Sequence, residues 1–484
     1  MPFSSLLFLH GFLPLFLAAY WLTPRRFKNL TGIAGSLAFY AWGAPRFLPV
    51  VVLLGVGDYY LSHAIARRTA LGTPDAAKAA KRLLVLGVFA HLVLLGYFKY
   101  SNFFMGQVND ALGHFGGRHL GWVAVVLPIG ISFITFEEIS YLTDVYRGDA
   151  KPARSLGHYL LFLTFFPHSI AGPIFRWKDL AAQLNARKQS FALVREGFAR
   201  FSVGLAKKVL LADSIAIVAD GVFGLPAAQL GTGLGWLGAC AYTLQIYFDF
   251  SGYSDMAIGL GKMCGFTFKE NFDMPYVAAS ITEFWQRWHI SLSRWLRDYL
   301  YIPLGGNRRG EHRATLNVVI VFTLSGLWHG AAWSFVVWGL YHGLFVALER
   351  VTGSVRNRIP LPIRHVATMV IVIVGWVFFR ATSLPSALHV LGAMAGRGQG
   401  APLAVFPAEL CPSFALFAMI VGALIVLYQL GIKYGPASPI EGGTPLRLPP
   451  WRVALSYAPG PVLFLASIAH LTNSRVAPLI YFKF

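Results

Sequence analysis

Long apolar stretches, separated by short polar and basic ones, are the dominant pattern along this chain. The stretch 314–348 carries no acidic residue, lysine or arginine, and at about 35 residues it is too long for a single membrane helix, which needs about 20. Arg313 precedes it and Arg350 follows it, and basic residues favour the cytoplasmic side of a membrane. We therefore expect two helices here, one that enters the membrane and one that returns.

The other apolar stretches have lengths typical of transmembrane or re-entrant helices. They lie at 6–22, 30–42, 47–65, 83–98, 122–136, 159–171, 230–248, 366–379, 414–430 and 453–471. Together with the pair at 314–348 they predict an all-α polytopic membrane protein with about a dozen transmembrane or re-entrant helices. No basic residues precede the first stretch and no clear cleavage site follows it, so we expect a retained helix rather than a removed signal peptide.

Three polar stretches interrupt the apolar ones. The stretch 176–208 is too polar to cross a membrane and too apolar at intervals to be disordered, which predicts helices lying on the cytoplasmic face. The stretch 266–313 is punctuated by proline and glycine, and 431–452 is typical of a loop. No internal repeat or separate soluble part is visible. We expect one membrane-embedded domain over 1–484, with a catalytic core at about 120–350.

The composition agrees with a membrane protein and changes the interpretation of its charge. Of 484 residues, 56% are hydrophobic and 13% charged, which is more apolar than a soluble enzyme. The formal net charge of +20 would suggest a nucleic-acid partner in a soluble protein. Here the basic residues gather in alternate loops, at 25–28, 67–82 and 147–154. This is the pattern of cytoplasmic loops, with the N-terminus outside, so we expect the lipid bilayer, and no nucleic acid, as a partner.

His329 lies inside the long apolar stretch, between small residues in Leu324-Ser325-Gly326-Leu327-Trp328-His329-Gly330. If 314–328 is helical, about 15 residues at about 1.5 Å each place His329 roughly 22 Å along the path, near the turn. An ionisable group at membrane depth costs free energy and is a functional-site hypothesis by default. The alternative is a neutral, hydrogen-bonded interior histidine.

A second histidine lies in an aromatic segment, 280–298. Ser280 with Glu283 three residues later is a capping-box pattern, so a helix is expected to begin there. On that helix Trp285, Trp288 and His289 share one side. The less specific interpretation is an interfacial helix whose tryptophans lie at the lipid headgroups.

His289 and His329 belong to different elements and could converge on one cavity. Neither has an acid or cysteine at ligand spacing, and the three cysteines, Cys240, Cys264 and Cys411, are scattered, so we expect neither a metal site nor a disulfide framework. A neutral imidazole can take a proton from an attacking hydroxyl group, which is the usual role of histidine in acyl transfer. No nucleophile elbow or phosphate-binding loop is present in the sequence.

Further polar residues lie in apolar surroundings, and each is expected to cap a helix or to form hydrogen bonds between helices. They are Asp58, Glu137, Glu138, Gln245, Asp249 and Asp255, with His168 and His342. His10, His63, His91, His365, His389 and His470 have no recognisable partners in the sequence.

At this point the segments match a known family. Phe284-Trp285-Gln286-Arg287-Trp288-His289-Ile290-Ser291-Leu292-Ser293, Arg297-Asp298-Tyr299-Leu300-Tyr301-Ile302-Pro303-Leu304-Gly305-Gly306-Asn307 and Leu324-Ser325-Gly326-Leu327-Trp328-His329-Gly330-Ala331-Ala332-Trp333 resemble the signature blocks of membrane-bound O-acyltransferases. The blocks 127–133, 245–255, 375–381 and 480–484 extend the resemblance over nearly the whole chain, and it is similar to the bacterial alginate O-acetyltransferase branch in particular. One departure is Phe136-Glu137-Glu138, where relatives of this branch often carry Phe-Gln.

The resemblance implies a multi-pass protein of the bacterial inner membrane whose helices surround a central funnel. It implies that His329 is catalytic, that His289 is the second member of the active site, that cytoplasmic acetyl-CoA is the donor, and that the acceptor is an exported polysaccharide or a periplasmic acetyltransferase partner. The candidate residues lining the substrate path are Trp285, Arg287, Trp288, Arg297, Asp298, Tyr299, Asn307, Trp328, Gln245, Asp249 and Ser325. Positive potential for the phosphates of coenzyme A is expected from Lys207, Lys208, Arg287, Arg294, Arg308 and Arg309.

Other functions fit parts of the same pattern. A teichoic-acid D-alanyl transferase of the family would take its acyl group from a carrier protein, and a peptidoglycan O-acetyltransferase would share every motif. A proton-coupled transporter also places His and Asp at membrane depth, but it accounts for neither histidine block.

Overall fold

The computed structural model describes residues 1–169, 172–356, 358–398, 400, 411–434 and 459–473. Within these residues the regular structure is helical and no β-strand is formed, so the predicted all-α class is confirmed. The terminal block 480–484 and most of the predicted loop 431–452 lie outside the described residues. The chain forms two compact units, one of Leu7–Leu193 with Gly261–Phe268, and one of Pro2–Leu6 and Val194–Leu260 with the chain from Lys269 onward.

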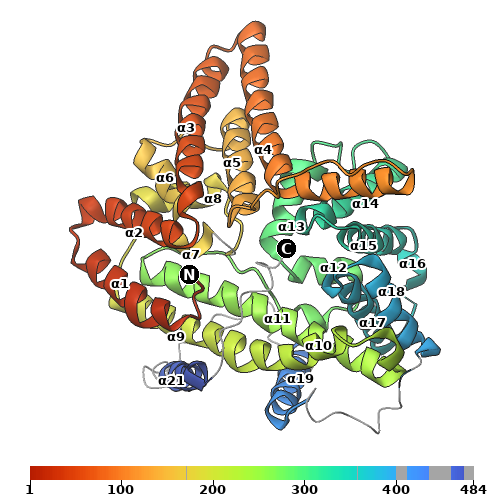
Figure 1. The fold of residues 1–484 in the computed structure, drawn as a ribbon. Coiled ribbons are helices and arrows are strands. Elements are labelled where there is room, and N and C mark those ends of the chain that lie inside the picture. The colour runs from red at the N-terminus through yellow and green to blue at the C-terminus, as the bar shows by residue number, and fades with distance from the viewer. Residues whose placement is uncertain (170–171, 357, 399, 401–410, 435–458, 474–484) are drawn as a thin grey trace. The chain divides into compact units, whose positions relative to one another are not determined.

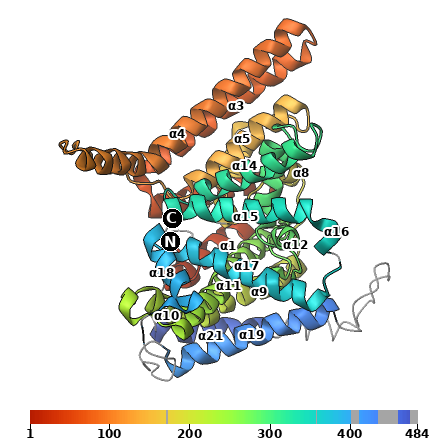
Figure 2. The same cartoon turned by 90° about the vertical axis from the view of Figure 1, so that its right-hand side faces the viewer.

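The first unit is built from short helices and a long helical hairpin that projects from them (Figure 1). Its elements are η1 (Phe8–Phe12), α1 (Leu13–Leu22), η2 (Arg25–Phe27), α2 (Lys28–Gly43), η3 (Pro45–Phe47), α3 (Leu48–Ala70), α4 (Pro74–His114), α5 (Ile131–Arg147), α6 (Leu156–Thr164), α7 (Phe166–Ser169) and α8 (Trp177–Asn185). Helices α3 and α4 run side by side, and α5 packs against both (Figures 1 and 2). The Thr73 side chain accepts a hydrogen bond from the Ala76 amide and so caps α4 at the turn.

The second unit contains the two histidine blocks. Its elements are α9 (Phe191–Ala206), η4 (Lys207–Ala212), α10 (Asp213–Phe223), η5 (Ala227–Gln229), α11 (Thr232–Met263), η6 (Pro275–Val277), α12 (Ile281–Arg287), α13 (Ile290–Leu296), η7 (Arg297–Tyr301), α14 (Glu311–His329), α15 (Trp333–Val351), α16 (Gly353–Arg356), α17 (Leu361–Arg380), α18 (Leu384–Gly392), η8 (Ala393–Arg397), α19 (Ser413–Tyr434) and α21 (Pro459–Asn473). Its core is aromatic: Trp288, Trp338 and Trp376 are each 1% exposed. The large rings bury much apolar area in a small space.

Helices α14 and α15 form the expected pair across 314–348, joined by a turn at 330–332 (Figure 2). Their backbones approach closely at two glycines. A Cβ atom on Gly326 would lie 2.2 Å from the Phe335 carbonyl oxygen, and one on Gly339 would lie 2.3 Å from the Phe322 carbonyl oxygen. Small residues permit this distance between membrane helices.

Within the described part of the chain, four helical segments are long and apolar enough to cross a membrane: Pro45–Ala70, Pro74–His114, Leu361–Arg380 and Ser413–Tyr434. The protein is therefore a multi-pass membrane protein by length and composition, but the expected number of about a dozen spans is not reached by this criterion. Several other apolar stretches form helices that are short or that include charged ends. Helix α14, for example, begins with Glu311, His312 and Arg313.

Two predicted elements differ from the structure. The stretch 122–136 is not one helix, because α5 begins only at Ile131, after Pro128 and after Gly130 with its left-handed φ of 76°. The stretch 176–208 does form helices α8 and α9, but its end does not lie on the surface. Lys208 is 3% exposed and its Nζ atom is 2.6 Å from carboxylate oxygens of both Asp213 and Asp249.

Candidate active site

His289 lies at a break between two helices. The predicted continuous helix over 280–298 is wrong, because α12 ends at Arg287 and α13 begins at Ile290. His289 has a φ of 45°, in the left-handed region that non-glycine residues seldom occupy. Such strained backbone conformations occur often at functional sites. The capping prediction is confirmed in part: Ser280 Oγ accepts from the Glu283 amide, but the Glu283 carboxylate accepts from the Ala279 amide.

Asn271 holds the imidazole of His289. Its Oδ1 atom is 3.2 Å from His289 Nδ1 and accepts a second hydrogen bond, 3.0 Å long, from the Ser291 amide. Because an amide N–H can only donate, the Asn271 atom facing it is an oxygen, and His289 Nδ1 must be the donor to that same oxygen. This assigns the tautomer with the lone pair on Nε2.

His329 ends α14 and is 5% exposed. Its ring centroid lies 5.1 Å from that of Trp338 and 5.2 Å from that of Phe379, both in edge-to-face orientation. The next residue must be glycine, since a Cβ atom on Gly330 would lie 2.1 Å from the Phe335 ring. The packing thus fixes the imidazole at the turn, where the sequence predicts it.

The two imidazoles lie together. Their ring centroids are 6.5 Å apart, and the Phe250 ring covers His289 at 4.7 Å. The expected convergence of the two histidine blocks is therefore present in the geometry. The roles of His289 and His329 in chemistry stay predictions.

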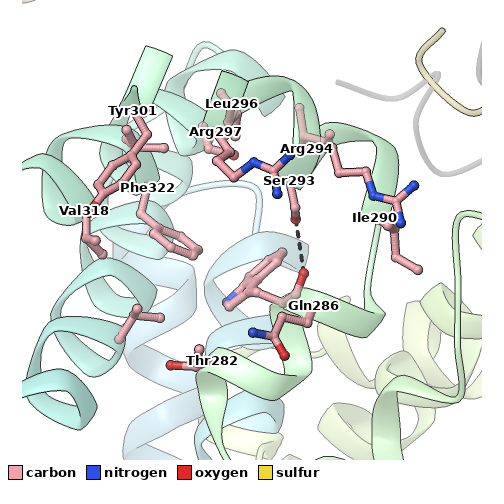
Figure 3. A pocket seen from close by; sticks show the side chains of 15 residues that line it. Thr282, Gln286, Ile290, Ser293, Arg294, Leu296, Arg297, Tyr301, Val318 and Phe322 are labelled. Carbon is pink, nitrogen blue, oxygen red and sulfur yellow. Dashed lines mark hydrogen bonds between the residues drawn. The ribbon is translucent and has the colours of Figure 1, made fainter. Parts of the chain in front are cut away.

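A cavity of about 520 Å³ opens beside α12 and α13, and we call it the arginine cavity (Figure 3). It is lined by Thr282, Trp285, Gln286, Ile290, Leu292, Ser293, Arg294, Leu296, Arg297, Tyr301, Val318, Val321, Phe322, Ser325 and Val346. Its wall is mostly apolar, with Arg294 and Arg297 along one side (Figure 3). Ser325 lies one helical turn before His329 on α14, and Ile290 follows His289 directly.

A second cavity, of about 420 Å³, lies at the turn between α14 and α15, and we call it the turn cavity. It is lined by Asp220, Tyr242, Gln245, Gly330, Ala331, Ala332, Ser334, Phe335, Arg380, Ala381 and Thr382. Arg380 Nη2 is 2.5 Å from Asp220 Oδ1. Along α14 the arginine cavity therefore comes first, His329 next and the turn cavity last.

The candidate lining residues separate into two groups. Trp285, Arg297 and Ser325 line the arginine cavity, and Gln245 lines the turn cavity. The others contact protein groups instead. Three are aromatic and pack on rings: Trp288 in the aromatic core, Trp328 on His329 and Tyr299 on Trp295. Four are polar and have protein partners: Asp298 pairs with Arg297, Asn307 accepts from Tyr301 and Arg350, Asp249 pairs with Lys208, and Arg287 pairs with Glu283 and Asp273.

The basic residues expected to attract phosphates differ in their surroundings. Lys208 is buried against two aspartates, as described above, and Lys207 Nζ lies 2.7 Å from Asp255 Oδ2. Their charges are thus compensated by protein carboxylates, which makes them a poor source of potential for a ligand. Of the expected set, Arg294 lines the arginine cavity, where Arg297 lies beside it.

Two functional candidates have only weak signals in the sequence. Asn271 contacts His289 although the two lie 18 positions apart. Asn271 belongs to no motif, so the sequence does not predict this contact. His91 has no recognisable partner in the sequence, yet its imidazole lies between Asp58 and Glu138, so the assignment of no partner to His91 is wrong. Tertiary packing decides both.

Comparison with known proteins agrees with the histidine blocks. The family model described as MBOAT, membrane-bound O-acyltransferase family, matches residues 152–388. A probable alginate O-acetylase AlgI of Pseudomonas putida is 44% identical over 494 residues, covering 100% of both chains. The chain belongs to the membrane-bound O-acyltransferase family. The predicted enzyme class, an O-acyltransferase (acetyltransferase), is thereby confirmed.

Other members of the family are also similar over most of the chain. A probable alginate O-acetylase AlgI of Azotobacter vinelandii is 42% identical over 508 residues, covering 100% of both chains. A peptidoglycan O-acetyltransferase of Helicobacter pylori is 37% identical over 432 residues, covering 81% of this chain and 80% of that one. The residues that the family model matches include both histidines and the lining of both cavities of this O-acyltransferase.

Proposed function

We propose that this O-acyltransferase moves an acetyl group from cytoplasmic acetyl-CoA to hydroxyl groups of an exported polysaccharide, or to a periplasmic partner that completes the transfer. The observation that carries the proposal is the pair His289 and His329, 6.5 Å apart, with cavity walls on both sides of it along α14. The higher identity to alginate O-acetylases than to the peptidoglycan O-acetyltransferase supports an exopolysaccharide such as alginate as the acceptor.

The donor enters through the arginine cavity in this proposal. Arg294 and Arg297 line it together with apolar side chains. This lining suits acetyl-CoA, which carries anionic phosphates at one end and an uncharged arm with the thioester at the other. The thioester carbon then meets the acceptor hydroxyl beside His329. The acceptor comes from the turn cavity, whose wall includes Gln245 and Ser334.

In the chemical step His329 acts as general base. It takes the proton of the acceptor hydroxyl while the oxygen attacks the thioester carbon, the carbon–sulfur bond breaks, and the proton returns to the departing thiolate. His289, held through Nδ1 by Asn271, orients His329 or stabilises the charge that develops.

We further propose that the protein is a multi-pass component of the bacterial inner membrane. The four long apolar helices support this placement. The shorter helices then cross or enter the membrane part-way around a central funnel, which brings the total toward a dozen.

The test is the same substitution at two buried histidines. His329→Gln is expected to lower the transfer of radiolabelled acetyl from acetyl-CoA by about 10²- to 10⁴-fold, the usual contribution of a general base. His342→Gln is the matched control, because His342 is equally buried on the neighbouring helix α15 but packs on Trp285 and Trp338 rather than on His289. Both variants are checked by gel filtration and by coenzyme A binding.

Full activity of a folded His329→Gln protein would refute the base assignment. Transfer that requires an acyl carrier protein instead of acetyl-CoA would favour the D-alanyl transferase. Acetylation of purified peptidoglycan but not of exopolysaccharide would show that the acceptor is peptidoglycan. Solute flux without acetyl-CoA turnover would favour a transporter.

A further inference from the structure

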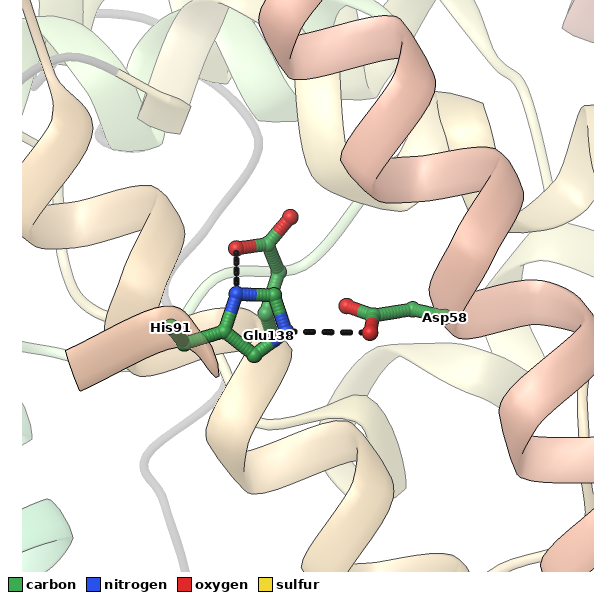
Figure 4. Close-up of side chains that lie close together, drawn as sticks. All are labelled: Asp58, His91 and Glu138. Carbon is green, nitrogen blue, oxygen red and sulfur yellow. Dashed lines mark hydrogen bonds and ion pairs between the residues drawn. The ribbon is translucent and has the colours of Figure 1, made fainter. Parts of the chain in front are cut away.

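The first unit contains a second buried polar cluster, formed by Asp58 on α3, His91 on α4 and Glu138 on α5 (Figure 4). His91 Nε2 is 2.9 Å from Asp58 Oδ1, and His91 Nδ1 is 3.0 Å from Glu138 Oε2. The side chains are 3%, 5% and 0% exposed for His91, Asp58 and Glu138. Three helices thus present ionisable groups to one point in the interior.

The hydrogen bonds around this cluster leave some of its atoms unsatisfied. His91 Nδ1 and Glu138 Oε2 form a 3.0 Å ion pair with poor hydrogen-bond angles, and the other carboxylate oxygen of Glu138, Oε1, has no hydrogen-bond partner among the described residues. Buried polar atoms almost always have a partner, and one without a partner costs free energy. A ligand at this point would supply the missing contacts.

The charges of the cluster lead to the same conclusion. With both carboxylates ionised and a proton on each ring nitrogen of His91, one negative charge remains unbalanced. Burying a net charge is costly, and buried charges in proteins are paired or bind metal ions. A divalent cation bound to a neutral imidazole and two carboxylates makes the cluster neutral.

The ligand atoms have suitable chemistry and spacing for such an ion. One atom from each of Asp58, His91 and Glu138 lies within 4.8 Å of the others. Zinc binding would require side-chain rotations that bring these atoms to roughly 2.0–2.2 Å from the ion. Imidazole nitrogen with carboxylate oxygen suits first-row transition ions better than calcium or magnesium, which prefer oxygen alone.

The surroundings would hold the ligands in place. The Tyr159 hydroxyl donates to the second oxygen of Asp58 over 3.2 Å, the kind of outer contact that orients a metal-binding carboxylate. We propose that Asp58, His91 and Glu138 bind a divalent transition-metal ion, zinc in the first instance, which ties α3, α4 and α5 together. The three residues are far apart in the chain, so no spacing motif announces the site.

The adjacent pair Glu137 and His168 offers a matched control. Glu137 precedes Glu138 on α5, is 1% exposed, and its Oε1 atom lies 3.0 Å from His168 Nδ1. It is a buried carboxylate with an imidazole partner, as Glu138 is, but it lies outside the proposed ligand set. Glu137→Gln and Glu138→Gln are therefore the same chemical change at neighbouring positions.

The experiment measures metal in the full-length protein, purified in detergent, stripped with a chelator and dialysed against zinc. Elemental analysis is expected to find about one zinc per chain in the wild type and in Glu137→Gln, with affinity at least about 10-fold weaker in Glu138→Gln. Zinc is also expected to raise the melting temperature of the wild type and not that of Glu138→Gln, since it binds only the folded state.

X-ray absorption of the wild-type zinc protein is a readout that does not depend on any variant folding. It is expected to show nitrogen and oxygen neighbours, including imidazole, and no sulfur. The proposal is overturned if folded wild-type protein retains neither zinc, manganese nor cobalt, or if Glu138→Gln binds zinc as the wild type does. Sulfur neighbours would assign the zinc to cysteines instead.

Discussion

At the scale of single residues, His289 combines an unusual backbone with a fixed side chain. A φ of 45° is uncommon for any residue other than glycine, and the structure holds His289 there with hydrogen bonds from the two residues that follow it. The Ile290 amide donates to the Asn271 carbonyl, and the Ser291 amide donates to Asn271 Oδ1. Asn271 is therefore a positioning residue for the imidazole.

A substitution at Asn271 separates this role from a purely structural one. Asn271→Asp keeps the accepting oxygen, and it loses only an Nδ2 group that has no hydrogen-bond partner among the described residues. The added negative charge favours protonated His289, so the acidic limb of the pH–rate profile should move to higher pH, by about one unit. Activity assayed across pH measures it, with Asn317→Asp, a buried asparagine bonded to backbone carbonyls, as the control.

An unchanged profile for a folded Asn271→Asp protein would mean that Asn271 does not act on His289 during turnover. A loss of activity that is equal at every pH would assign Asn271 to structure alone.

At the scale of elements, the α14–α15 hairpin places His329. The glycines at 326 and 339 let the two backbones approach, and the turn at 330–332 leaves the imidazole against Trp338 of the returning helix. Larger side chains at the crossing would separate the helices and move His329 relative to His289. Precise helix contact therefore serves the geometry of the pair as well as stability.

Gly339→Ala tests this contact. The new methyl group would meet the Phe322 carbonyl oxygen at 2.3 Å, so we expect a loss of about 1–3 kcal/mol in stability and a larger fractional loss of transfer activity than of coenzyme A binding. Gly353→Ala is the matched control, because nothing lies within 4 Å of its added Cβ. Melting temperature and turnover in detergent measure both effects, and equal behaviour of the two variants would contradict the role of the crossing.

At the scale of the whole molecule, segments far apart in the chain meet through charged groups. Glu283 on α12 accepts from Lys433 on α19, from Arg287 and from the Ala279 amide. Burial by itself raises the pKa of Glu283, but these hydrogen bonds together hold that pKa below its ordinary value. The contact joins the histidine block to a helix that follows it by 150 positions.

The sign of the pH dependence follows from the lowered pKa. The stabilising contribution of Glu283 is present above the ordinary glutamate pKa and is lost as the pH falls through the lowered pKa of the folded state. Glu283→Gln should therefore lower the melting temperature at neutral pH. The difference from wild type should shrink below the ordinary glutamate pKa of about 4.3 and vanish below the lowered pKa of the folded state. Asp75→Asn, which removes an exposed pair with Lys78, should change little at any pH. A difference for Glu283→Gln that persists in acid would assign the effect to packing.

The sequence by itself determined the all-helical membrane class, the helical hairpin with His329 next to its turn, and the two histidine blocks. These features rest on hydropathy, local propensity and contiguous motifs, which are properties of neighbouring residues. The lengths of the apolar stretches did not predict the number of transmembrane helices, since many helices are short and polar at their ends. The hydrophobic periodicity did not predict the helix break at His289, because the left-handed backbone there depends on Asn271, 18 positions away.

Only the tertiary structure decided which polar groups meet. The 6.5 Å approach of His289 and His329, the pairing of Lys208 with two aspartates, and the cluster of Asp58, His91 and Glu138 each join separate helices. Their common cause is burial. A polar group in an apolar interior must find a partner, but packing of whole helices, which no local pattern records, selects that partner.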